Sequence, residues 1–204
     1  MTLLDVYQSK YHTSSDISEH LPILLAYAKQ CVSITECGVR EPTSAYAFTA
    51  GLKDTPGNWY RMIDPYKSVL IDPFLAECNS EGVNASFVQA SDLDCERIQT
   101  DLLFIDSWHI YGQLKRELAY WNTHVSKFII LHDTTVDEIH GESIRMEMNI
   151  AEQVRSSGFP EHEIRRGLGP AVSEFLAEHP EWILDLKLTN NNGLTILKKL
   201  TSRT

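Results

Sequence analysis

The chain has 204 residues, of which 43% are hydrophobic, and a formal net charge of −10. This length suits one domain with a full core, and no apolar run approaches the roughly 20 residues of a membrane span. The acidic balance argues against nucleic acid or an anionic membrane as partner, because both need a basic face. The N-terminus lacks signal-peptide features, and the four cysteines form no CxxC pair, so we expect reduced, buried thiols in a cytoplasmic protein.

Residues 1–15 show no clear periodicity and are expected to form an N-terminal arm, either a flap over a site or a docked segment. A helix is predicted next. Ser15 or Asp16 can cap it, Glu19 is placed for a capping box, and apolar residues then recur at helical spacing through Ala28.

A strand, a tight turn and a helix are predicted over residues 31–52. The strand ends in Glu36, Cys37 and Gly38, and helical spacing resumes at residues 44–52. A glycine at such a turn permits close approach of a ligand to the backbone, and the N-terminus of the helix offers free N–H groups.

Two further strands are predicted to end in acids. Residues 68–71 precede Asp72, and residues 84–90 precede Asp92. An acid about thirty residues beyond the glycine turn suits hydrogen bonds to ribose hydroxyls. Asp72 is equally well placed to cap a helix at residues 74–77.

Residues 101–106 and 127–132 contain apolar runs typical of strands buried on both faces of a parallel sheet. The polar residues at or just beyond their ends are Asp106, His109, His132 and Asp133. If the two strands are neighbours, these side chains meet at one rim, where open α/β sheets bind ligands. Alternatively, the two aspartates cap the following helices and the first histidine packs against Trp108.

The remaining elements complete an α/β pattern. Helices are predicted over residues 111–125, 138–157 and 171–179, and two strands at 182–188 and 194–200 flank an Asn-Gly hairpin turn. We therefore expect one domain over residues 1–204. It would be a three-layer Rossmann-like domain with a mostly parallel seven-stranded sheet and a C-terminal antiparallel hairpin.

This order of elements resembles the class I S-adenosylmethionine-dependent methyltransferases over residues 17–200. Glu36 to Gly38 resemble the acidic-glycine turn after the first strand. Residues 106–111 resemble a D-x-x-H-x-Y segment after the fourth strand, and residues 131–134 resemble an H-D-T segment after the fifth. Within the family, the chain looks similar to cephalosporin hydroxylase-type and macrolide or sugar O-methyltransferases.

The resemblance implies roles for residues that would hold S-adenosylmethionine. Glu36 and Gly38 would border its methionine part, Asp72 would hold the ribose hydroxyls, and Asp92 would lie near the adenine amino group. His109 matches the proposed general base, with Asp106 beside it in the catalytic site.

In the metal-dependent relatives, the acid after the fourth strand and an acidic pair after the fifth bind magnesium. The matching residues are Asp106, His132 and Asp133. His132 departs from that pattern, because magnesium prefers oxygen ligands. Whether Mg²⁺ or another divalent cation takes part is therefore left open.

The resemblance implies an O-methyltransferase that methylates a hydroxyl of a small molecule, such as a sugar or polyphenol, without nucleic acid or membrane partners. A homo-oligomer is compatible with it. Glu41 and Pro42 stand where relatives have further glycines, so a non-catalytic binding protein on the same fold is the alternative. A metal-dependent hydroxylase ranks third.

Overall fold

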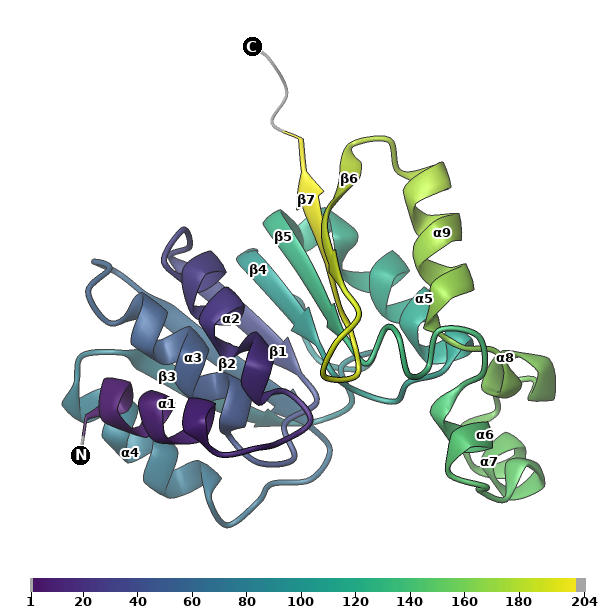
Figure 1. Cartoon of the computed structure of the whole chain (residues 1–204), viewed down its shortest axis with the longest axis horizontal. Coiled ribbons are helices and arrows are strands. Elements are labelled where there is room, and N and C mark those ends of the chain that lie inside the picture. Colours follow the sequence, from purple (N-terminus) through teal and green to yellow (C-terminus); the bar gives the residue numbers. More distant parts are fainter. Residues whose placement is uncertain (1, 201–204) are drawn as a thin grey trace.

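The computed structural model describes residues 2–200, which form one seven-stranded sheet with helices on both faces (Figure 1). The strand order is β3-β2-β1-β4-β5-β7-β6. The first five strands are parallel, and β7 runs antiparallel to both β5 and β6. The predicted three-layer α/β fold with a C-terminal hairpin is confirmed.

The elements have the following bounds. The strands are β1 (Ser33–Cys37), β2 (Trp59–Asp64), β3 (Asn84–Gln89), β4 (Thr100–Ile105), β5 (Val125–His132), β6 (Trp182–Leu188) and β7 (Leu194–Lys199). The α-helices are α1 (Leu3–His12), α2 (Leu21–Ala28), α3 (Thr43–Leu52), α4 (Ile71–Ser80), α5 (Tyr111–Trp121), α6 (Glu142–Arg145), α7 (Ile150–Ser157), α8 (Glu161–Arg165) and α9 (Leu168–Glu178). Two 3₁₀ turns are η1 (Ser18–His20) and η2 (Asn122–His124).

Two apolar clusters hold the layers together. Helices α1 to α4 supply one cluster on one face of the sheet, and α5 and α9 supply the other (Figure 1). The amphipathic stripe expected on α5 is confirmed, since Leu114, Leu118 and Trp121 are all buried. All four cysteines are buried and unbridged, as expected.

The N-terminal arm is a docked helix. Thr2 and Asp5 form a capping box at the start of α1, and Leu3 and Tyr7 are buried in the apolar cluster, where α1 packs on α3. The cap expected at Ser15 or Asp16 is wrong, because the following η1 turn has no side-chain cap.

The strand predicted at residues 68–71 is also wrong. The second strand is β2, and the predicted segment is a turn that leads into α4, with the Val69 side chain 89% exposed. Strand β2 is hard to recognise from the sequence because Arg61 interrupts its apolar run. Its guanidinium group is satisfied inside the fold by the carbonyl oxygen of Glu96, 2.8 Å away.

The helix predicted over residues 138–157 is instead two shorter helices, α6 and α7. The helical path is interrupted at Glu147, which has a φ angle of 51°. Asn149 then caps α7 by accepting a hydrogen bond from the Glu152 N–H. Helix α7 ends at Gly158, as predicted. None of the helices within residues 2–200 has the length and apolar character needed to cross a membrane.

Candidate active site

A cavity of about 630 Å³ opens at the carboxyl ends of the parallel strands. Each of these strands contributes at its carboxyl end, since the wall includes Gly38, Asp64, Asp92, Asp106 and Asp133. The segment before η1 closes another side through residues 15–17. The cavity therefore lies where open α/β sheets bind their ligands.

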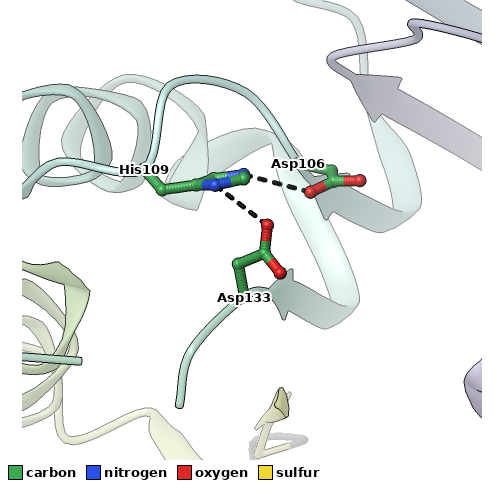
Figure 2. Close-up of side chains that lie close together, drawn as sticks. All are labelled: Asp106, His109 and Asp133. Atoms are coloured by element: carbon green, nitrogen blue, oxygen red, sulfur yellow. Dashed lines mark hydrogen bonds and ion pairs between the residues drawn. The ribbon is translucent and has the colours of Figure 1, made fainter. Parts of the chain in front are cut away.

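Three predicted site residues meet in this cavity. Figure 2 shows the His109 ring between the carboxylates of Asp106 and Asp133. The ring Nε2 lies 3.1 Å from Asp106 Oδ1, and the ring Nδ1 lies 2.9 Å from Asp133 Oδ2. The ligand atoms of all three residues lie within 4.8 Å of one another, so β4 and β5 do bring these side chains to one rim.

Two more carboxylates, which the sequence did not indicate, approach the same imidazole. His109 Nδ1 lies 3.3 Å from Asp137 Oδ2 and 3.6 Å from Glu142 Oε2. Glu142 also accepts a hydrogen bond from the His109 backbone N–H at 3.2 Å. Asp137 is fully buried and is neutralised by Arg145, which binds both carboxylate oxygens at 2.7 and 2.9 Å.

The electrostatics of this cluster favour positive charge. Burial alone would raise the pKa of Asp106, but hydrogen bonds with His109 and His132 hold it well below its usual range. Burial alone would lower the pKa of His109, but the close carboxylates of Asp106, Asp133 and Asp137 raise it well above its usual range. These carboxylates therefore favour the protonated form of the ring.

The donor set fits a divalent cation. His109 Nδ1 and Asp133 Oδ1 are buried atoms without an aligned hydrogen-bond partner among the described residues. Two carboxylates and one imidazole are a ligand set used by Mn²⁺, Fe²⁺ and Zn²⁺, whereas Mg²⁺ prefers oxygen alone.

The structure does not favour His132 as a ligand. Its Nδ1 lies 3.2 Å from Asp106 Oδ1, and its Nε2 lies 3.2 Å from the carbonyl oxygen of Asp16. Both ring nitrogens thus have partners, and His109 takes its place in the group of metal-compatible atoms. The role of His132 is instead to hold the Asp106 carboxylate in place through the contact with its Oδ1.

Gly38 is required by packing against the protein itself. Its φ angle is 87°, and a Cβ atom there would lie 2.1 Å from the backbone oxygen of Asp106. The predicted close approach is therefore made by the chain that follows β4. Gly38 still lines the cavity, so the turn also borders any ligand bound there.

Glu36 lies behind the cavity and does not line it. The carboxylate is buried and accepts hydrogen bonds from the hydroxyl groups of Ser44 and Tyr60. Burial raises its pKa to about 8. Direct contact with a cofactor, which the resemblance implied, is not supported by this position.

The acid that follows the second strand is Asp64, not Asp72. The side chain of Asp72 is 75% exposed on α4 and pairs with Lys67. Asp64 lines the cavity, and its two oxygens accept the backbone N–H groups of Val39 at 2.6 Å and Tyr66 at 2.7 Å. The tripeptide Ile-Asp-Pro occurs twice in this stretch, and the predicted strand preceded the second copy.

Asp92 occupies its predicted place at the end of the third strand. Its Oδ1 accepts a hydrogen bond from the Gln113 amide at 3.1 Å. The Glu117 carboxyl group lies next to the Asp92 carboxylate. Burial and the nearby Asp92 charge raise the pKa of Glu117 well above its usual range.

The rim joins segments far apart in the sequence. Arg40 pairs with Asp16 at 3.1 Å across the cavity wall. The turn between β6 and β7 also contributes, because the Asn191 side chain accepts from the Glu19 N–H at 3.0 Å and donates to the Ser15 carbonyl oxygen at 2.8 Å. The sequence pattern predicts this stretch only as a hairpin turn.

In sequence comparisons, no protein-family profile and no curated protein matches the chain. Structural comparison does find similar proteins. The SAH-bound methyltransferase PaMTH1 of Podospora anserina is 16% identical, with a TM-score of 0.57 over 98% of this chain and 88% of that chain.

Two O-methyltransferases are similar to the same degree. TomG from Streptomyces achromogenes, solved in complex with SAM, is 14% identical, with a TM-score of 0.58 over 93% of this chain and 82% of that chain. An enzyme from Bacillus cereus in complex with SAH is 13% identical, with a TM-score of 0.57 over 97% and 88%. At identities this low, the structural similarity shows a common fold and nothing more. The likeness to the cephalosporin hydroxylase-type group stays a prediction.

Proposed function

From the class I methyltransferase fold of this chain, we propose an S-adenosylmethionine-dependent O-methyltransferase that acts on a hydroxyl group of a small molecule. The observation that carries this proposal is one cavity that combines two sets of groups. The first is a cofactor half formed by Gly38, Asp64 and Asp92. The second is an acceptor half formed by Asp106, His109, Asp133 and Glu142.

The cofactor half has acceptors suited to an adenosine. Asp64 is held by two backbone N–H groups, which leaves lone pairs on both oxygens for ribose hydroxyls. Asp92 lines the same cavity at the end of the third strand, where its carboxylate suits the adenine amino group. These assignments replace Asp72 with Asp64 and retain Asp92.

The acceptor half must align a hydroxyl oxygen with the methyl group and remove its proton. The cofactor supplies the electrophilic methyl group. Asp106, His109 and Asp133 would hold a divalent cation, which when bound lowers the pKa of the acceptor hydroxyl. With a cation held by the two carboxylates, a neutral His109 imidazole would complete the ligand set or accept the hydroxyl proton.

The alternatives have weaker support. Glu41, the feature that suggested a non-catalytic binding protein, lies in the wall of a cavity that is still open. A hydroxylase with non-haem iron typically uses two histidines and one carboxylate. The metal-compatible cluster found among residues 2–200 has one histidine and two carboxylates.

The proposal is tested by calorimetric titration of the purified protein with S-adenosylmethionine and with its demethylated product, S-adenosylhomocysteine. Each titration is run with and without Mg²⁺ or Mn²⁺. We expect micromolar binding of both ligands. Absence of binding under every condition would contradict the proposal and favour the non-catalytic alternative.

A further inference from the structure

The charges that line the cavity bear on the kind of acceptor it can admit. Among the described residues that line it are seven carboxylates, against one guanidinium group, one imidazole and no lysine. The carboxylates belong to Asp16, Glu41, Asp64, Asp92, Asp106, Asp133 and Glu142. Such an imbalance in a confined site favours positive ligands and disfavours negative ones.

The two arginines near the acceptor half are already paired. Arg40 binds Asp16 at the rim, and Arg145 binds Asp137 through both carboxylate oxygens. The charge of each guanidinium group is therefore already offset by a carboxylate, which weakens the attraction of either for an anionic acceptor. Desolvated like charges brought together are strongly unfavourable.

A divalent cation would not reverse this balance. Three carboxylates, those of Asp106, Asp133 and Glu142, face the His109 ring. The charge of a divalent cation offsets two carboxylates and would leave the third uncompensated. Asp133, which is 6% exposed, also has an oxygen without a hydrogen-bond partner among residues 2–200.

Glu142 and Trp108 form the part of the wall best suited to an ammonium group. Both line the cavity, and the Trp108 indole N–H donates to the hydroxyl of Ser143, next to Glu142, at 3.2 Å. The Trp108 ring lies nearly parallel to the Phe159 ring, with centroids 5.8 Å apart. A carboxylate and an aromatic ring in one cavity wall are groups that recognise alkylammonium ions.

We propose that the acceptor is an amine-bearing hydroxyl compound, whose ammonium group binds at Glu142 and Trp108, and that anionic acceptors are rejected. This inference rests on the proposed methyltransferase function. It adds the charge of the acceptor, which the fold does not specify.

The test compares acceptors matched in shape and opposite in charge. Dopamine is paired with 3,4-dihydroxyphenylacetate, and glucosamine with glucuronate, each with S-adenosylmethionine and Mn²⁺. Formation of S-adenosylhomocysteine is measured. In at least one pair we expect kcat/KM to be about tenfold or more higher for the amine, the value of one charge-assisted contact.

Two variants locate the effect. Glu142→Gln keeps an oxygen for the His109 backbone N–H but removes the charge, so the preference for the amine should fall roughly tenfold through a higher KM. Glu41→Gln removes a charge from the cofactor side of the same cavity and should leave the preference unchanged.

The outcomes separate the two proposals. Equal turnover of amine and carboxylate, or no turnover of any of the four compounds by protein that binds the cofactor, overturns the inference about charge. A protein that binds neither S-adenosylmethionine nor S-adenosylhomocysteine overturns the proposed function instead.

Discussion

The two halves of the cavity hold their acidic residues by different means. In the cofactor half, Asp64 is fixed by backbone N–H groups and Asp92 by the Gln113 amide. In the acceptor half, Asp106 and Asp133 are fixed by His109, whose own charge depends on them. Hydrogen bonds from amide groups therefore position the acids of the cofactor half, whereas ionic contacts with His109 position those of the acceptor half. The acceptor half should therefore respond more strongly to the loss of a single group.

The largest effect is expected from Asp106→Asn. This change removes the charge that His109 and His132 share, so kcat/KM should fall about 10³-fold, within the range for acid–base groups. Asp101→Asn, at the opposite end of β4, is the matched control and should retain activity. Near-normal turnover in the Asp106 variant would show that the acceptor half is not the reacting site.

A second contrast concerns stability. Arg145→Ala leaves the buried carboxylate of Asp137 without its cation, so the free energy of unfolding should fall by about 2 kcal/mol in urea denaturation. Arg165→Ala removes an exposed pair with Glu161 and should cost less than about 0.5 kcal/mol. Equal losses would mean that charge does not organise the acceptor half.

The pH dependence of stability probes the layer beneath the cofactor half. The pKa of Glu36 is raised by folding, so its contribution is fully present below the unfolded value and is lost as pH rises through about 8. Between pH 6 and pH 9, the wild-type free energy of unfolding should fall by about 2 kcal/mol from this group. Glu36→Gln should flatten that part of the curve, and an unchanged curve would contradict the buried, protonated state.

The two Ile-Asp-Pro tripeptides provide a matched pair for the cofactor half. Asp64→Asn should weaken S-adenosylmethionine binding about tenfold in calorimetry, whereas Asp72→Asn should leave it unchanged. Weaker binding only in the Asp72 variant would restore the assignment made from sequence.

The smallest effect is expected at Asn191, which joins the β6–β7 turn to the cavity wall. Asn191→Gly removes both side-chain hydrogen bonds but tolerates the φ angle of 45°. Stability should fall by about 1 kcal/mol, and amide exchange should increase at residues 15–19. Unchanged exchange would show that the turn does not hold this wall.

Much of the fold could be predicted because the buried strands of a parallel sheet are continuous apolar runs. Strands β4 and β5 are of this kind, and the positions of Asp106, His109 and Asp133 followed from their ends. Strand β2 was missed because Arg61 interrupts it, and that error moved the ribose-binding prediction from Asp64 to Asp72.

The rest of the site depends on contacts that no local pattern encodes. Asp137 and Glu142 contact His109 from the segment that follows β5, which the sequence pattern did not resolve into its turns and short helices. Asn191 donates to the Ser15 carbonyl oxygen in the cavity wall, but its place in an Asn-rich hairpin turn already accounts for the residue type, so the sequence gives no sign of this contact. His132 follows β5 as expected, but only the structure shows that both its nitrogens are already engaged.

The central claim is that one cavity binds the cofactor on one side and a divalent cation on the other. A crystal structure of the protein grown with S-adenosylhomocysteine and Mn²⁺ tests it most directly. We predict the ribose at Asp64, the adenine at Asp92 and an anomalous manganese peak among Asp106, His109 and Asp133. A cavity without S-adenosylhomocysteine at saturating concentration, or manganese bound elsewhere, would contradict the account.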